Sequence, residues 1–240
     1  KFMKNLPKIL AFDLDGTLTK SKADLETNIA EVLYSLLKYV KIFVISGASE
    51  DQFEKQFIKF LPNKDRLNNL YIFAENGGSM LKHENGKWKV QYEDKFNKEE
   101  SEKIINAFEK VLEKFNLKEK EGYGKIIENR GAQITLSALG QKAPLEEKQK
   151  WDIEQEKRRE IKAFLEPILS EFEIRIGGST SIDITKKNIN KAKAIEKAIK
   201  SLNIEKKDIL YYGDALYMGG NDEIVKEDEI PCQVVHNSAE

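Results

Sequence analysis

The sequence predicts an α/β protein in which a Rossmann-like parallel-sheet core is interrupted by an inserted α+β cap domain. Three observations predict this class. Short apolar runs alternate with helical patterns over residues 8–74, the pattern changes to hairpins and long charged helices from about Gly86, and the alternation resumes after residue 184. Alternation of strands and helices is typical of a parallel sheet with helices on both faces. We therefore expect a core of residues 1–86 and 185–240 and a cap of residues 87–184.

Three short apolar runs predict the first strands of the core, and each run stops at a polar loop: Lys8–Phe12, Ile42–Ile45 and Leu70–Ala74. Apolar residues at helical spacing fill the gaps between these runs. Thr27 is the expected N-cap of the first helix, while Ser49 and Gln52 have the spacing of a capping box that opens the second. Pro62 is expected to end that second helix.

The middle of the chain predicts a separate α+β module. Asn85-Gly86 is typical of a hairpin turn, and a helix with an apolar stripe follows it between Ile104 and Phe115. The later elements are expected at Lys125–Leu139 (strands), Glu146–Leu169 (a helix interrupted by Pro167), Phe172–Ile176 and Ser181–Ile184 (strands). The charged stretch from Glu146 to Lys162 predicts a solvated helix face. The core then resumes with a helix through Ala194–Leu202 and strands at Ile209–Tyr212 and Cys232–Val235.

Composition excludes several classes of protein. The 240 residues include 40 Lys plus Arg against 41 Asp plus Glu, a net charge of -1, which argues against nucleic-acid and membrane-surface partners. The hydrophobic fraction of 40% is ample for a buried core, so a disordered chain is excluded.

The single cysteine, Cys232, cannot form an internal disulfide, and with only two histidines a Cys/His zinc site is not expected. No apolar run approaches the roughly 18 residues of a membrane span and no secretory leader precedes the first strand, so we expect a cytoplasmic protein.

The first predicted strand ends in Asp13-Leu-Asp15-Gly-Thr17. Ligands of open parallel sheets bind beyond the carboxyl ends of the strands. Two carboxylates one residue apart can face one site there, where a hard divalent cation such as Mg²⁺ would offset their charge. The alternative is an Asx turn that merely closes the strand, which is the commoner fate of a lone Asp-Gly.

A second acidic loop follows the strand at 209–212, where Gly213-Asp214 precedes Gly219-Gly-Asn-Asp222. Alone, this loop could be a turn. Together with Asp13 and Asp15 it supplies a density of acids that indicates a metal site.

Two further residues suit a phosphate. Ser46 ends the second strand and offers a hydroxyl, although Ser-Gly also simply ends strands. Lys191 opens a helix, where the macrodipole disfavours a cation, so it needs an anionic partner unless it is a solvated surface residue. A carboxylate that attacks phosphorus, a second acid that moves protons, and a metal and a lysine that offset charge form a coherent site for covalent phosphoryl transfer.

These loops resemble the signature motifs of the haloacid dehalogenase (HAD) superfamily, in which the cap would be the larger, second type. Within it the chain is most similar to the eukaryotic-type phosphomannomutase family, over most of its length. The stretches that carry this closer resemblance are Glu75-Asn-Gly-Gly78, Asn129-Arg130-Gly131 leading to Ser137-Ala-Leu-Gly140, Ile176-Gly-Gly178 leading to Ser181-Ile-Asp183, and the paired-glycine loop before Asp222.

The resemblance implies roles in the core. Asp13 would be the nucleophile and Asp15 the general acid/base, and Ser46 and Lys191 would hold the transferring phosphoryl group. Mg²⁺ would bind Asp13, the backbone carbonyl of Asp15, and Asp214, with Asp222 nearby.

In the cap, the resemblance implies that Arg130, Ser181 and Asp183 grip the sugar phosphate. Two positions depart from the family, because Gln141 and Lys22 stand where the family has arginines. Lysine can neutralise phosphate as a point charge but glutamine cannot, although the neighbouring Lys142 could reach the same anion.

The implied function is Mg²⁺-dependent phosphoryl transfer on hexose phosphates, interconverting mannose 6-phosphate and mannose 1-phosphate with a hexose 1,6-bisphosphate as activator. A sugar-phosphate phosphatase on the same scaffold is the first alternative, because Gln141 weakens the grip on a bisphosphate. A phospho-aspartate signalling domain would leave the cap and Asp15 unexplained, and a non-catalytic sugar-phosphate binder would leave Asp13 and Asp15 unexplained. The resemblance also implies a homodimer joined through the caps.

Overall fold

The computed structural model describes residues 7–20, 23–62 and 65–238, and the chain divides into two compact units. The core unit comprises Lys1–Glu93 and Asn190–Glu240, and the cap unit comprises Asp94–Ile189. The core unit is therefore formed by two stretches of the sequence, and the cap unit lies between them in the chain.

The core unit is built on one sheet, with the strand order β11-β10-β1-β2-β3-β4-β5 in the described residues. The strands are β1 (Ile9–Phe12), β2 (Lys41–Ile45), β3 (Leu70–Ala74), β4 (Ser79–Glu84), β5 (Lys87–Glu93), β10 (Ile209–Gly213) and β11 (Cys232–Val234). The five strands from β11 to β3 are parallel, and β4 and β5 continue the sheet as antiparallel strands. The predicted parallel-sheet core is confirmed.

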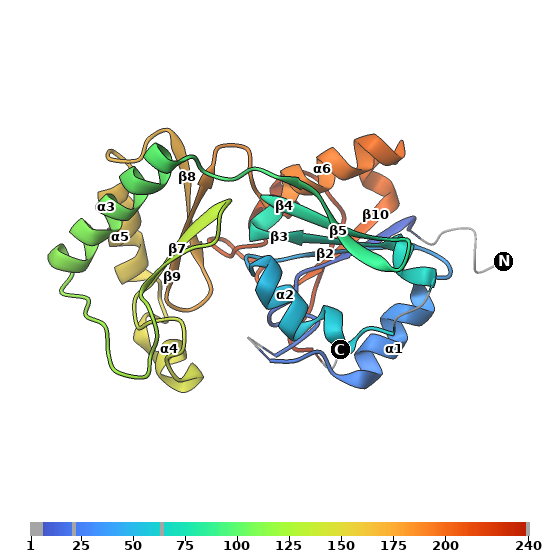
Figure 1. Ribbon diagram of the computed structural model, residues 1–240, viewed down its shortest axis with the longest axis horizontal. Helices are drawn as coiled ribbons and strands as arrows, with labels where there is room; N and C mark the ends of the chain where they lie inside the picture. The colour runs from blue at the N-terminus through green and yellow to red at the C-terminus, as the bar shows by residue number, and fades with distance from the viewer. Residues whose placement is uncertain (1–6, 21–22, 63–64, 239–240) are drawn as a thin grey trace. The chain divides into compact units, whose positions relative to one another are not determined.

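Helices cover both faces of this sheet. They are α1 (Thr27–Leu36), α2 (Glu50–Gln56), α6 (Lys191–Leu202) and α7 (Glu223–Glu227), with short 3₁₀ turns η2 (Ile58–Phe60), η3 (Asp65–Asn69), η4 (Glu75–Gly77) and η5 (Lys206–Asp208). Strand β2 sends Ile42 and Val44 into the cluster formed with α1 and α2, and Phe43 and Ile45 into the cluster formed with α6. Figure 1 shows α6 on one side of the strands and α1 and α2 on the other.

The ends of two helices differ from the sequence prediction. Helix α1 has Glu26 as its N-cap, and Thr27 is its first helical residue, so Thr27 does not cap it. Ser49 does cap α2 by accepting a hydrogen bond from the Gln52 amide, but α2 ends at Gln56 and the chain continues as η2 instead of reaching Pro62 as one helix.

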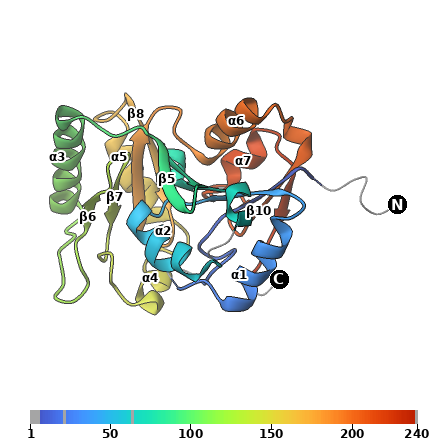
Figure 2. The same ribbon diagram turned by 45° about the vertical axis from the view of Figure 1, so that its right-hand side comes forward.

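The cap unit is an antiparallel sheet with the strand order β6-β7-β9-β8 in the described residues. Its elements are β6 (Ile127–Asn129), β7 (Gln133–Ser137), β8 (Phe172–Gly177), β9 (Ser181–Lys186), α3 (Lys98–Lys114), α4 (Leu145–Trp151) and α5 (Glu156–Leu165). Apolar residues of β7 and β9, such as Leu136 and Ile184, share a buried cluster with Phe108 of α3 and Ile161 of α5. Figure 2 shows α3 and α5 beside this sheet.

The boundaries of the two units differ from those we predict from the sequence. Asn85-Gly86 forms the expected hairpin turn, but a hairpin joins two paired strands, so β5 pairs with β4 and stays in the core sheet. Strand β9 runs past residue 184 to Lys186 because it pairs along its whole length with β8.

The predicted helix Glu146–Leu169 is broken in the structure by residues 152–155. Asp152 leaves the helical conformation, and its carboxylate accepts hydrogen bonds from the backbone amides of Lys157 and Arg158. The Arg158 guanidinium is buried against the same carboxylate, with Nε 2.8 Å from Oδ2, and it also donates to the carbonyl of Gly178. The charged stretch is therefore only partly a solvated face.

Replacing Arg158 with Met is expected to destabilise the protein by about 3–5 kcal/mol, because it leaves the Asp152 carboxylate buried without its partner. Chemical denaturation measures this loss, and Arg159→Met, at the exposed neighbouring position, is the matched control. Burial opposes the charge on Asp152, but its hydrogen bonds from Arg158 and Lys157 lower the pKa of Asp152. The advantage of the wild type should therefore be present above about pH 4 and shrink as the pH falls further. Equal losses in both variants would contradict this role.

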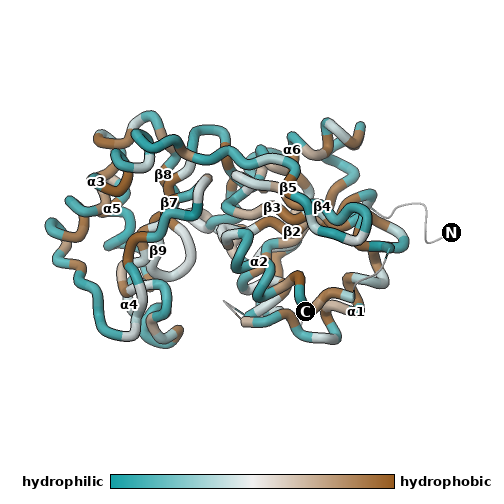
Figure 3. Tube along the Cα trace, in the orientation of Figure 1, coloured by the Kyte–Doolittle hydropathy of each residue, from teal (hydrophilic) through white to brown (hydrophobic). Residues whose placement is uncertain are grey.

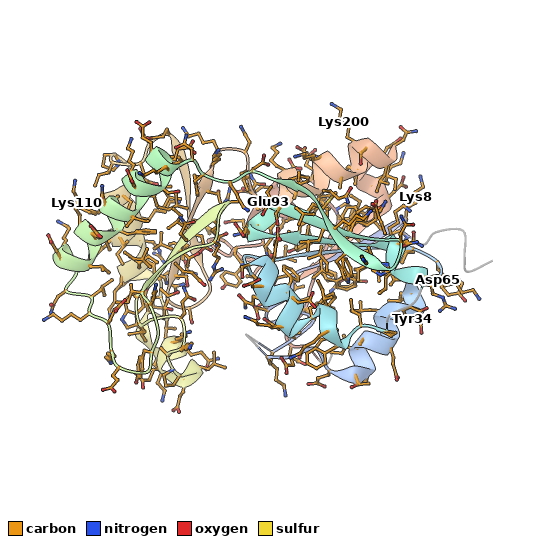
Figure 4. All side chains as sticks on the ribbon, viewed as in Figure 1. Lys8, Tyr34, Asp65, Glu93, Lys110 and Lys200 are labelled. Carbon is orange, nitrogen blue, oxygen red and sulfur yellow. The ribbon has the colours of Figure 1, made fainter. Side chains whose placement is uncertain are left out.

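Hydrophobic residues lie along the central strands, and charged side chains lie on the surface. The tube in Figure 3 is hydrophobic along β2 and β3, while Lys110 of α3 and Lys200 of α6 point away from their units in Figure 4. Among the described residues, none of the helices combines the length and the apolar character that crossing a bilayer would take.

Candidate active site

The carboxyl ends of three neighbouring strands place the candidate site in the core unit. Phe12 of β1 is in register with Tyr212 of β10 and with Val44 of β2, so the residues that follow these strands leave the sheet at one edge. Asp13 continues the ladder by donating its backbone amide to the Tyr212 carbonyl at 2.9 Å. The side chain of Asp13 is therefore fixed where the sheet ends.

A lysine joins two of the predicted acids. Lys191 Nζ lies 2.5 Å from Asp13 Oδ1 and 2.7 Å from Asp222 Oδ1, and all three side chains are buried. Helix α6 begins at Lys191 because the preceding Asn190 side chain caps it by accepting from the Lys193 amide. The anionic partners that a lysine at a helix start needs are thus Asp13 and Asp222.

Asp222 is held from three sides. Besides Lys191, it accepts hydrogen bonds from the Tyr211 hydroxyl at 2.6 Å and from the Ala215 amide at 3.2 Å. The loop that returns Asp222 to the site is tight, because a Cβ on Gly220 would lie 2.0 Å from the Ala215 carbonyl oxygen. Only glycine fits at position 220, and Gly219 has φ +81, a left-handed conformation that favours glycine.

Asp214 approaches the nucleophile loop closely. Gly16 has φ +93, and a Cβ at this position would lie 2.4 Å from Asp214 Oδ2. Glycine therefore lets the turn form and lets the carboxylate come near it. The carboxylates of Asp13, Asp214 and Asp222 each offer an oxygen such that the three oxygens lie within 4.8 Å of one another.

The electrostatics of this cluster favour an added cation. Burial raises the pKa of the Asp13 carboxyl well above its usual range, Lys191 opposes that rise, and Asp222 and Asp214 add to it. Burial and Asp222 likewise raise the pKa of Asp214. Burial disfavours the charge on Lys191, but Asp13 and Asp222 outweigh it and raise the pKa of Lys191. Three carboxylates face one ammonium, and oxygen-only donors with excess negative charge suit a hard divalent cation.

Asp15 is held by Gln56, a residue outside the motifs that predict the site. Gln56, the buried last residue of α2, donates its side-chain amide to Asp15 Oδ1 at 3.0 Å. Its position between Phe53 and Phe57 on the apolar side of α2 is the signal that could have revealed it, since an amide on such a face requires a polar partner.

Ser46 lies at the same edge of the sheet, buried after β2. Its hydroxyl accepts from the Ala48 amide at 3.2 Å, and its carbonyl accepts from the Asn76 amide at 2.8 Å. Glu75 and Asn76 have φ of 53 and 56, the left-handed region, and this turn lets the loop after β3 clamp the loop after β2. Thr17 Oγ1 is buried at the nucleophile loop, with no hydrogen-bond partner among the described residues, so it suits a ligand oxygen.

The predicted cap residues are described within the cap unit alone. Asp183 and Ser181 face the polar side of the cap sheet, where Asp183 accepts from Thr135 at 2.8 Å and Ser181 lies 3.1 Å from the Ser137 hydroxyl. The opposite side of the same strands is apolar, as the period of two in a strand requires. Lys22 lies outside the described residues.

Arg130 is already paired in the cap. Its Nε and Nη2 lie 2.8 and 2.7 Å from one oxygen of Glu128, and Nη2 lies 3.5 Å from Gln141 Oε1. Lys148, which belongs to the stretch expected to be a solvated face, is instead buried and donates to the Gln141 carbonyl at 2.8 Å, whereas Lys142 is exposed. The buried ammonium beside Gln141 in this structure is therefore that of Lys148.

The fold and the site together define the class of protein. An open parallel sheet with a buried Asp13–Lys191–Asp222 arrangement at its carboxyl edge is that of an α/β enzyme, a phosphotransferase or hydrolase. The family model for haloacid dehalogenase-like hydrolases matches residues 10–217, and the chain belongs to that family.

Phosphomannomutases and an IMP-nucleotidase are among the known proteins to which this chain is similar. The chain is 27% identical over 227 residues to phosphomannomutase 2 of Dictyostelium discoideum, covering 91% of this chain and 86% of that one, and 26% identical over 230 residues to a phosphomannomutase of Schizosaccharomyces pombe, covering 91% and 85%. Among solved structures, IMP-nucleotidase of Plasmodium falciparum superposes with a TM-score of 0.71 at 21% identity, covering 98% of this chain and 66% of that one. The last similarity shows a shared fold.

Proposed function

We propose that the protein transfers phosphoryl groups on hexose phosphates through an aspartyl phosphate on Asp13, and that it interconverts mannose 6-phosphate and mannose 1-phosphate. The observation that carries the proposal is the buried Asp13 carboxylate, held by Lys191 at the carboxyl edge of the sheet beside Asp214 and Asp222. The similarity to phosphomannomutases along nine tenths of the chain supports the choice of substrate.

The residues of the core would share the chemistry as follows. An oxygen of Asp13 attacks phosphorus, and Lys191 orients that carboxylate and offsets charge. Asp15 gives a proton to the leaving sugar oxygen and later takes one from the attacking hydroxyl. Ser46 and Thr17 offer hydroxyls to the oxygens of the phosphoryl group.

Asp13, Asp214 and Asp222 fit Mg²⁺ by their donor type and their charge, and the Asp15 carbonyl would complete the protein's ligands. When bound, the ion would neutralise the negative charge that the phosphoryl group brings to this acidic cluster. In the cap, Arg130, Ser181 and Asp183 would recognise the sugar phosphate, with Gln141 beside Arg130 and with the Lys148 ammonium bound to the Gln141 carbonyl.

The test separates a mutase from a phosphatase by the fate of the aspartyl phosphate. Mannose 1-phosphate is supplied with and without a catalytic amount of a hexose 1,6-bisphosphate, and mannose 6-phosphate and free phosphate are measured together. We expect isomerisation that the bisphosphate stimulates. Stoichiometric release of phosphate without isomerisation would make the protein a phosphatase, because water would then reach the intermediate first.

Gln141 is expected to determine how much of the aspartyl phosphate is hydrolysed instead of being transferred back to the sugar. A charged hydrogen bond is worth about 1.5–3 kcal/mol, or roughly a ten- to hundred-fold effect, so Gln141→Arg should raise the ratio of isomerisation to hydrolysis by about that factor. Gln149→Arg adds the same charge at an exposed position of α4 and should leave the ratio unchanged. A homodimer joined through the caps stays a prediction that the family resemblance makes.

A further inference from the structure

Gln56 is a buried amide whose side chain is held by three partners. Its Nε2 lies 3.0 Å from Asp15 Oδ1 and 3.1 Å from Thr19 Oγ1, and its Oε1 accepts from Gln52 Nε2 at 3.0 Å. Its backbone carbonyl also accepts from the Leu25 amide at 2.8 Å. Both protons of the amide and its oxygen are therefore engaged, and its position is fixed from both ends.

The direction of these hydrogen bonds follows from Thr19. The Thr19 hydroxyl donates its only proton to the Leu14 carbonyl, so it can only accept from Gln56. The NH₂ group of Gln56 must then face Thr19 and Asp15, and Gln52 accordingly meets the amide oxygen. Since an NH₂ group has no lone pair to offer, Asp15 Oδ1 is an acceptor in this contact.

We propose, on the basis of the proposed function, that Gln56 is a positioning residue for Asp15 in acid/base transfer. It holds Oδ1 as an acceptor, so that Oδ2 carries the proton. In the first step a bond forms between an Asp13 oxygen and phosphorus while the bond from phosphorus to the sugar oxygen breaks. The electron pair of that bond stays on the sugar oxygen, which takes the proton from Asp15, and Asp15 is left ionised.

The experiment compares two phosphate esters with different needs for that proton. A sugar alkoxide must be protonated as it leaves, whereas p-nitrophenolate leaves as a stabilised anion. Gln56→Met keeps an unbranched side chain of similar length but removes the donor. We expect it to slow single-turnover phosphorylation by mannose 1-phosphate roughly ten- to hundred-fold. The burst of p-nitrophenolate from p-nitrophenyl phosphate should change by less than about threefold, and KM should change little.

Thr19→Val is the matched control, because it removes the other acceptor of the same amide and leaves the Asp15 contact in place. It should alter both esters by less than about threefold. Equal losses on both esters in Gln56→Met would mean that Gln56 supports only the fold. No loss on the hexose ester would mean that Gln56 does not position Asp15. Either result overturns the proposal, although phosphoryl transfer through Asp13 would still stand. A wild type that releases no p-nitrophenolate and accepts no hexose phosphate would instead overturn the proposed function, and this role with it.

Discussion

Asp13→Asn is expected to abolish phosphoryl transfer, lowering turnover of any accepted hexose phosphate by roughly 10⁴-fold or more. The amide that replaces the carboxylate has nearly the same volume but is a poor nucleophile, so no aspartyl phosphate forms. Turnover and trapping of the phosphorylated enzyme measure this loss. Asp51→Asn makes the same chemical change at an exposed position of α2 and should leave both unchanged.

The same variant should fold as well as the wild type. The pKa of Asp13 is raised because burial, with the nearby Asp222 and Asp214, disfavours its charge more than Lys191 favours it. A raised pKa in the folded state means that stability is lost as the carboxyl ionises with rising pH. Removing the ionisable group therefore should not lower Tm near neutral pH, and Lys191 keeps Asp222 as its partner. Substantial activity in a folded Asp13→Asn protein would contradict the assignment of Asp13 as the nucleophile.

The sequence predicts the core strands and the acidic residues that follow them, because both depend on short-range patterns of apolar and polar residues. Apolar runs that stop at polar residues locate β1, β2 and β10, and parallel strands carry the residues after them to one edge. For that reason Asp13, Asp214, Asp222 and Lys191 are found together in the structure as the pattern predicts.

Three buried polar residues could not be predicted from such patterns. Gln56, Lys148 and Arg158 are buried only because a carboxylate or a carbonyl from another loop reaches them. In the sequence, Lys148 and Arg158 stand in a charged stretch that predicts a solvated face, whereas Gln56 stands between Phe53 and Phe57 on the apolar side of α2. The break at Asp152 has the same origin, because its carboxylate is bound by residues five and six positions later instead of by solvent.

Removal of divalent cations is the second large effect that we expect. Exhaustive chelation should abolish turnover, and Mg²⁺ should restore it, because Asp13, Asp214 and Asp222 crowd one site, where among the described residues the Lys191 ammonium is the cation paired with Asp13 and Asp222. A readout that does not depend on activity is the thermal shift. Mg²⁺ at 100 times its Kd stabilises a folded protein by about 2.7 kcal/mol, which for a chain of this length raises Tm by roughly 5–11 °C.

Asp214→Asn is the sharpest variant for this test. Asp222 accepts hydrogen bonds from Lys191 and Tyr211, so replacing Asp222 would also disturb the lysine that holds the nucleophile. The hydrogen bonds of Lys191 go to Asp13 and Asp222, so replacing Asp214 leaves them in place. Asp214→Asn should therefore lose most of the Mg²⁺-induced shift in Tm and most of the activity, yet keep its Tm in the absence of the ion. That Tm should even rise, because burial and Asp222 raise the pKa of Asp214 and its charge costs stability in the folded state. Undiminished turnover after chelation, or a full Mg²⁺ shift in Asp214→Asn, would remove the metal from this cluster and leave Lys191 as the cation that offsets the phosphoryl charge.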